Sequence, residues 1–201
     1  MKHFICLDVE LGGLPTETSL LTLYIGFFVL NDGKFTLLQE LDLKIKPNDG
    51  IYKLTSQGME VNKINFIEHD KVAITEKQAG TELYRKLQLW NSIANDKLIP
   101  VGQNILGDIK RITDHLISVA SWENFVSIKV LDTCIIGQFL KICDKLPEDV
   151  SLSLENLGLF FDINIDGNLH EAKYDVLLNI KILEELMKIV NITDSIELRT
   201  H

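Results

Sequence analysis

Five residues whose side chains bind metal ions or transfer protons occur at three widely separated places in the sequence. Asp8 and Glu10 lie near the start, Asp108 lies in the middle, and His170 and Asp175 lie in the last third. Carboxylate oxygens are the ligands that Mg²⁺ and Mn²⁺ prefer in proteins. If the fold brings these residues together, they form a buried site for two hard divalent cations.

Asp8 and Glu10 stand at the end of an apolar segment that is typical of a buried strand. Residues two apart in a strand point to the same face and lie about 6 to 7 Å apart along the chain. The two carboxylates can therefore approach one ion while Leu7 and Val9 face the other way. Because a pair of this kind is otherwise an ordinary solvated strand end, it needs partners elsewhere in the chain.

Asp108 lies near the apolar side of a predicted helix. At roughly 100° per residue it falls near Ile105, Ile112 and Leu116 rather than with Lys110. A carboxylate beside an apolar face costs several kcal/mol unless it is paired or bound to a cation. The alternative is a buried carboxylate that accepts hydrogen bonds from backbone amides.

His170 and Asp175 are five positions apart, which on one continuous helix would separate them by about 140°. They can converge if His170 lies in the loop before the helix. The turn-forming sequence Asp166-Gly167-Asn168 immediately upstream favours that arrangement. The alternative is a surface histidine and a solvated aspartate.

Length, composition and charge restrict the class of protein. The chain has 201 residues and is 46% hydrophobic, which predicts one compact domain over residues 1–201. Its formal charge of −9, from 29 acidic and 20 basic residues, argues against a large basic footprint on nucleic acid. It does not exclude a nucleic-acid substrate, because bound cations reverse the sign of an acidic site. A weakly basic region, at Lys44, Lys46, Lys53, Lys63 and Lys71, is read mainly as solvated surface.

The compartment is inferred from cysteines and hydropathy. Cys6, Cys134 and Cys143 are an odd number without a CxxC spacing, which favours core positions in a reducing environment. The most apolar stretch, Leu20 to Leu30, falls short of the roughly 18 to 20 residues that span a bilayer. We therefore expect a soluble, cytoplasmic protein with no membrane partner.

The hydrophobic pattern predicts strands first and helices later. We expect a three-strand antiparallel meander, a turn at Asn31-Asp32-Gly33, and then alternating helices and strands. This order predicts an α/β fold in which a mixed sheet of the ribonuclease H kind is flanked by helices. The expected strands are His3 to Glu10, Leu21 to Leu30, Phe35 to Ile45, Leu98 to Val101 and Val126 to Leu131. The expected helices lie around Gln57 to Lys63, after the capping-box pair Thr75 and Gln78, around Ile105 to Leu116, after Asp132-Thr133, around Leu152 to Leu157, and from Ala172 to Val190.

The order and separation of four short motifs carry a resemblance to a known family. These motifs are Asp8-Val9-Glu10 with Gly13-Leu14, Gly102-Gln103-Asn104 with Asp108, Asp132-Thr133, and His170-x-Ala172-x-x-Asp175. On them the chain resembles, over nearly its whole length, the DEDDh-type 3′-to-5′ exonucleases, which are DnaQ-like and include proofreading exonucleases, ribonuclease T and oligoribonuclease. The family pattern often has two threonines where this chain has Leu11-Gly12, and often histidine where it has Gln103.

The resemblance implies a catalytic site that uses two Mg²⁺ or Mn²⁺ ions. Asp8, Glu10 and Asp175 would hold one ion, while Asp8 and Asp108 would support the second. His170 would accept the proton of the attacking water. The product would be a nucleoside 5′-monophosphate. The same resemblance implies contacts with the terminal nucleotide near the first two motifs, at Leu11, Gly13, Leu14 and Asn104, with Leu14 wedging the base and amides near Leu11 binding the 3′-hydroxyl.

Several alternatives remain open at this point. The implied substrate is the 3′ end of single-stranded nucleic acid, with DNA favoured over RNA because the region Val61-Asn62-Lys63-Ile64 resembles that of short bacterial and phage members. Trimming of RNA ends, an oligoribonuclease-like activity, a phosphohydrolase acting on small esters and an inactive nucleic-acid or protein binding module are the alternatives. A polymerase partner and homo-oligomerisation are left open.

Overall fold

A six-stranded mixed sheet forms the centre of the structure, a computed structural model that describes residues 2–13, 18–164 and 171–192, with side chains as far as residue 190. The strand order is β4-β3-β2-β1-β5-β6. β1, β2 and β3 are antiparallel neighbours, whereas β4, β5 and β6 each run parallel to the strand beside them. The strands are β1 (His3–Leu11), β2 (Leu20–Asn31), β3 (Lys34–Lys46), β4 (Ile74–Thr75), β5 (Ile99–Gly102) and β6 (Leu131–Asp132).

The meander depends on a two-residue turn between its second and third strands. Asp32 and Gly33 have positive φ angles of 48° and 74°, and they directly join β2 to β3. Turns of this kind match the twist of a hairpin and favour Asn, Asp and Gly. The predicted turn and the predicted three-strand meander are both confirmed.

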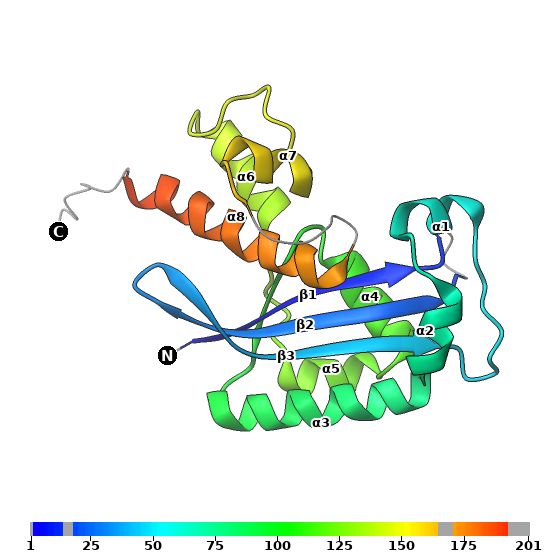
Figure 1. Ribbon diagram of the computed structural model, residues 1–201. Helices are drawn as coiled ribbons and strands as arrows, with labels where there is room; N and C mark the ends of the chain where they lie inside the picture. Colours follow the sequence, from blue (N-terminus) through cyan, green and yellow to red (C-terminus); the bar gives the residue numbers. More distant parts are fainter. Residues whose placement is uncertain (1, 14–17, 165–170, 193–201) are drawn as a thin grey trace.

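Helices cover both faces of the sheet (Figure 1). α3 and α5 lie against one face, and α6, α7 and α8 lie on the other side. α1 and α2 stand beyond the end of the meander at which β1 stops. The helices are α1 (Ser56–Asn62), α2 (Phe66–Val72), α3 (Glu76–Ala94), α4 (Leu106–His115), α5 (Val119–Phe125), α6 (Thr133–Ile142), α7 (Leu154–Phe160) and α8 (Ala172–Ile192).

Side-chain caps fix the starts of two helices that frame the sheet. Thr75 and Gln78 form the predicted capping box at α3, in which each side chain satisfies a backbone amide. Asp132 ends β6 and accepts hydrogen bonds from the amides of Cys134 and Ile135, so it caps α6. A cap of this kind stabilises a helix by about 1 kcal/mol.

Two apolar clusters hold the layers together. The larger one joins one face of β1, β2 and β3 to α3, α4 and α5, and Phe27 stacks there on Trp90 with 5.0 Å between ring centroids. The second joins the opposite face to α8 through Phe4, Tyr24 and Val176. Burial of each such side chain contributes roughly 1.5 to 3 kcal/mol.

The strand predicted before β6 is wrong. Instead of a strand over Val126 to Leu131, the structure has a single bridge between Leu98 and Val126, and the strand itself covers only Leu131 and Asp132. Ile128 is 75% exposed, and the Ser127 hydroxyl binds the Lys129 amide, so this apolar segment turns in solvent. The short elements α2, α5 and β4 were also missed.

The described ranges contain no helix with the length and apolar character needed to cross a bilayer. The thiols of Cys6, Cys134 and Cys143 are free, and only Cys6 is fully buried.

Candidate metal centre and adjoining cavities

Three carboxylates from distant parts of the chain meet at one end of the sheet. Asp8 and Glu10 lie on the same face of β1, and Asp175 lies in the first turn of α8. One potential ligand atom from each lies within 4.8 Å of the others. Oxygen donors at this separation fit a hard divalent cation such as Mg²⁺ or Mn²⁺. The structure thus brings together three of the five residues singled out in the sequence.

Buried polar contacts fix α8 against β1 below these carboxylates. The Cys6 thiol, two residues before Asp8, lies 3.7 Å from the carbonyl oxygen of Val176, which follows Asp175. One turn further along, Asn179 donates a 3.0 Å hydrogen bond from its amide to the hydroxyl of Thr133 in α6. β1, α6 and α8 are thereby joined, so Asp175 is carried by a helix with a fixed position.

Asp108 approaches the same end of the sheet from the first turn of α4. Backbone amides of Asp108 itself and of Val9 stabilise its charged form, but burial outweighs them and raises its pKa to about 7. The start of α4 is held by Asp132, whose carboxylate accepts a 3.1 Å hydrogen bond from the Ile105 amide. Asp108 is not one of the three residues within 4.8 Å of one another, so its place in the site is adjacent.

The carboxylates raise one another's pKa values. Burial raises the pKa of Asp8 well above its usual range, and the nearby charges of Asp108, Glu10 and Asp175 raise it further. Burial and the charges of Asp175 and Asp108 raise the pKa of Glu10 to about 8, although Lys44 opposes the shift. A group of carboxylates that destabilise each other's anions is stabilised by a bound cation. The donor set and its electrostatics therefore fit a divalent metal ion.

Two of the residues proposed from the sequence lie outside the described residues. They are His170, the candidate proton acceptor, and Leu14, the candidate base wedge. Their roles remain predictions. The helix that carries Asp175 begins at Ala172.

The segment that follows Glu10 is held in place by the region around α1. The side-chain amide of Asn62 donates a 2.9 Å hydrogen bond to the Leu11 carbonyl, and the Thr55 amide donates a 2.7 Å bond to the Gly12 carbonyl. The backbones approach so closely that a Cβ on Gly58 would lie 2.4 Å from the Gly12 carbonyl oxygen. Glycine at position 58 therefore allows α1 to pack on this segment.

A small cavity of about 210 Å³ lies between this segment and α1. Leu11 and Gly13, both named from the sequence, are at its wall, and Glu10 connects it with the carboxylate cluster. The remaining lining residues are Val9, Gln57, Gly58, Val61 and Asn62. This mainly apolar space next to acidic ligands suits a flat ring attached to a polar backbone.

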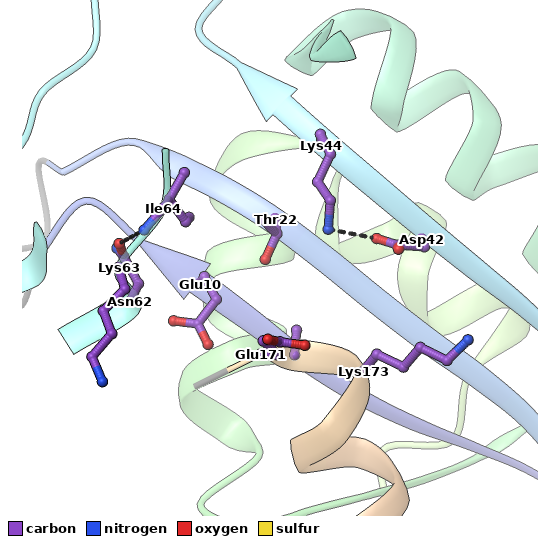
Figure 2. A pocket seen from close by; sticks show the side chains of 10 residues that line it. Glu10, Thr22, Asp42, Lys44, Asn62, Lys63, Ile64, Glu171 and Lys173 are labelled. Carbon is purple, nitrogen blue, oxygen red and sulfur yellow. Dashed lines mark hydrogen bonds and ion pairs between the residues drawn. The ribbon is translucent and has the colours of Figure 1, made fainter. Parts of the chain in front are cut away.

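A larger cavity of about 550 Å³ lies on the other side of Glu10 (Figure 2). Glu10, Thr22 and Lys44 are register neighbours across β1, β2 and β3, so they form one row on the sheet. The Thr22 side chain points from this row into the space that Glu171 borders. The other lining residues are Asp42, Asn62, Lys63, Ile64, Ala172 and Lys173.

Asn104, also named from the sequence as a substrate contact, lies just before α4, and its role remains a prediction. It precedes α4 in a left-handed conformation with φ of 51°, and its carbonyl accepts a 3.0 Å hydrogen bond from the Gly107 amide. Its side chain is exposed, and it lines neither the 210 Å³ nor the 550 Å³ cavity. The neighbouring Gln103 donates a hydrogen bond to the Leu152 carbonyl.

Thr22 and Lys44 were not proposed as site residues from the sequence. Thr22 lies within the most apolar stretch of the sequence, and Lys44 was read only as one of several surface lysines. Apolar and polar residues alternate along β3, and its polar residues Asp42 and Lys44 lie opposite Tyr24 and Thr22 of β2. To recognise Thr22 and Lys44 as neighbours, one needs the register between β2 and β3, which the sequence does not supply.

Comparisons with known proteins identify the fold. No family model and no curated protein matches the sequence. Solved structures do match, among them exonuclease I of E. coli in complex with a dT13 oligonucleotide, with a TM-score of 0.73 and 14% identity over 95% of this chain and 42% of that chain. A moderately thermophilic exonuclease I from Methylocaldum szegediense gives a TM-score of 0.71 and 15% identity over 96% of this chain and 42% of that one. Exonuclease X in complex with 5′ overhanging duplex DNA gives a TM-score of 0.59 and 15% identity over 94% of this chain and 92% of that one.

These likenesses confirm the ribonuclease H-like mixed α/β fold predicted from the sequence. The chain spans about two fifths of the length of the exonuclease I chains, and nearly all of exonuclease X.

Proposed function

We propose that this chain is a DEDDh-type 3′-to-5′ exonuclease that hydrolyses the terminal phosphodiester of single-stranded nucleic acid, with DNA preferred over RNA. The observation that carries this proposal is the convergence of Asp8, Glu10 and Asp175 within 4.8 Å, with Asp108 adjacent. The fold shared with structures of exonucleases I and X supports it. Residues 1–201 would act as one exonuclease domain that releases nucleoside 5′-monophosphates.

Each part of the site has a chemical role in this proposal. Asp8, Glu10 and Asp175 would hold one Mg²⁺ or Mn²⁺, and Asp8 and Asp108 would hold a second. When bound, such ions activate water and neutralise the charge that develops on the phosphate and on the leaving oxygen. His170 would accept the proton of the attacking water, because a histidine with an ordinary pKa near 6.5 exchanges protons close to neutral pH.

The small cavity beside Leu11 and Gly13 would hold the terminal nucleotide. Its wall includes Val9, Leu11 and Val61, which can contact the flat face of a base, and Glu10 lies at its edge, where a sugar hydroxyl could bind. Leu14 would wedge the terminal base, as the family resemblance implies. The neighbouring exonuclease I structures were solved with dT13 and dA16 oligonucleotides, which supports a single DNA strand as the substrate.

A digestion assay tests this function directly. Purified protein in Mg²⁺ or Mn²⁺ should shorten a 5′-labelled single DNA strand progressively from its 3′ end, and chelation with EDTA should stop the reaction. A matched RNA strand should be shortened more slowly, as should a blunt duplex. Equal cleavage of a strand with a blocked 3′ end would contradict an exonuclease. Cleavage of nitrophenyl esters without any cleavage of strands would instead indicate a phosphohydrolase.

A further inference from the structure

Thr22 carries a buried hydroxyl whose environment leaves its hydrogen-bonding capacity unused. The residue is only 6% exposed, and within the described part of the chain its Oγ1 has no hydrogen-bond partner. A buried hydroxyl without a partner is destabilising, so proteins usually keep one only where a ligand or water completes it. The hydroxyl points into the 550 Å³ cavity (Figure 2).

Lys44 supplies a positive charge next to this hydroxyl. The two residues are register neighbours on β2 and β3, and residues opposite each other in this way have Cβ atoms about 5 Å apart. The charge of Lys44 is also felt at Glu10, whose pKa it lowers. Lys63 and Lys173 lie at two other sides of the cavity (Figure 2).

The ion pair that Lys44 makes is weak enough to exchange. Lys44 Nζ lies 3.0 Å from Asp42 Oδ1, and the two side chains are 43% and 44% exposed. An exposed pair of this kind contributes at most about 1 kcal/mol. A phosphate oxygen could therefore replace the carboxylate at little cost, or bind to the ammonium group alongside it.

We propose that Thr22 and Lys44 bind a second phosphate group of the substrate strand, separate from the phosphate held at the carboxylate cluster. A hydroxyl and an ammonium group together are donors suited to phosphate oxygens. Thr22 and Lys44 themselves offer hydrogen-bond donors and a positive charge but no anionic ligand for a metal ion, and a base would fit the apolar cavity on the other side of Glu10 better. This second phosphate site rests on the proposed function. It would make the affinity for the substrate depend on a phosphate other than the one that is cleaved.

Equilibrium binding tests this site without any reaction. The affinity of a labelled single-stranded DNA 10-mer is measured in EDTA over a range of salt concentrations, for the wild type, Thr22→Val and Lys44→Gln. Lys44→Gln should weaken binding about tenfold and reduce the slope of log K against log salt by about 0.7, the value for one phosphate contact on a single strand. Thr22→Val should weaken binding about threefold without changing the slope, because it removes a neutral donor.

Matched controls come from the exposed start of β3. Thr36→Val and Lys34→Gln make the same chemical changes at exposed positions that do not line the cavity. Both should bind the strand as the wild type does. Unchanged affinity and salt slope in Thr22→Val and Lys44→Gln, or losses equal to those in the controls, would overturn the proposed phosphate site.

A stability measurement separates binding from a structural role for Thr22. Valine has nearly the same shape as threonine, and it removes a hydroxyl that has no partner among the described residues. The melting temperature of Thr22→Val should therefore equal or exceed that of the wild type in the absence of substrate. A lower melting temperature accompanied by normal DNA binding would show that the hydroxyl is structural.

Turnover distinguishes failure of this inference from failure of the proposed function. The two variants and the wild type are compared on the DNA strand and on thymidine 5′-(p-nitrophenyl phosphate), which has only the phosphate that is cleaved. Thr22→Val should raise KM for the strand severalfold and leave the ester unaffected. Lys44→Gln should raise KM for the strand more than KM for the ester, because loss of its charge also acts on Glu10. Equal effects on both substrates would overturn the second phosphate site. A wild type that cleaves neither would refute the proposed function, while the binding ratios would still decide the phosphate site.

Discussion

The two faces of the meander formed by β1, β2 and β3 have opposite characters. One face is mainly apolar, with Leu7, Ile25 and Leu43 buried under α3, α4 and α5. The other face is apolar only where α8 covers it, and near the end of β1 it presents Asp8, Glu10 and the cavity that Thr22 and Lys44 line. Adjacent residues of the same strands therefore serve stability on one face and ligand binding on the other.

The difference shows where the fold places its unfavourable interactions. On the α3 face, apolar side chains pack against one another, whereas the α8 face gathers carboxylates whose pKa values are raised by burial and by one another. Proteins retain such groups where a ligand completes them. Substitutions on the α3 face should therefore lower stability and leave activity nearly unchanged. Substitutions in the carboxylate cluster should lower activity and leave stability unchanged or higher.

Asp8→Asn should give the largest change in activity with no loss of stability. Asn keeps the shape of the side chain but removes the charge that burial and the neighbouring Asp108 and Glu10 disfavour. Exonuclease activity should fall by about three orders of magnitude or more, while the metal-free melting temperature stays equal or rises. Digestion assays and thermal unfolding in EDTA measure the two effects. Asp114→Asn, at an exposed position of α4, should change neither.

The matching substitution on the other face reverses this pattern. Phe27 is fully buried and stacks on Trp90, so Phe27→Ala should lower the free energy of unfolding by about 3 to 5 kcal/mol. Activity per folded molecule should remain close to that of the wild type. If Asp8→Asn destabilised the protein as Phe27→Ala does, the division of roles between the faces would be wrong.

The pH dependence of stability should report the carboxylate cluster. The pKa of Glu10 is raised from 4.5 to about 8 and that of Asp108 from 3.8 to about 7, so the folded protein retains protons that the unfolded chain releases. This contribution to stability is complete below the unfolded pKa values and is lost as pH rises through the folded ones. In EDTA, the melting temperature should therefore fall by roughly 5 °C between pH 6 and pH 9.

Mg²⁺ should oppose this decrease, because metal binding requires the deprotonated carboxylates. The stabilisation by a fixed Mg²⁺ concentration should therefore be larger at pH 8 than at pH 6. Glu10→Gln should flatten the pH profile measured in EDTA, whereas Asp114→Asn should leave it unchanged. A wild-type melting temperature that increases with pH over this interval would contradict the raised pKa values.

Local sequence patterns predicted most of the scaffold. The apolar run of β1, the Asp32-Gly33 turn and the capping box at Thr75 each depend on neighbouring residues, and the structure has all three. The strand expected over Val126 to Leu131 was wrong because pairing with β5, and not composition, determines where β6 begins. Apolar residues such as Ile128 have no strand to pair with there.

The residues of the candidate site could be predicted where the residue type itself indicates a function. They could not be predicted where the function depends on the register between strands. Carboxylates are rare in apolar surroundings, so Asp8, Glu10, Asp108 and Asp175 could be singled out in the sequence. The structure brings the first two and Asp175 within 4.8 Å of one another and places Asp108 beside them. Thr22 is an ordinary residue for a strand. Its significance comes from the pairing of β1, β2 and β3, which places it between Glu10 and Lys44.

Two threonine caps provide the finest test of the contrast between scaffold and site. Thr75 caps α3 by accepting from the Gln78 amide, and Thr55 caps α1 by accepting from the Gly58 amide. The Thr55 hydroxyl also lies 3.3 Å from the Gly12 carbonyl, to which it can donate, beside the 210 Å³ cavity.

Substitution of either threonine by alanine should lower the free energy of unfolding by about 1 kcal/mol. Only Thr55→Ala should also raise KM for a DNA strand, because it loosens the segment that would hold the terminal nucleotide. Equal KM values in the two variants would show that α1 belongs with the scaffold and that the small cavity does not receive the 3′ end.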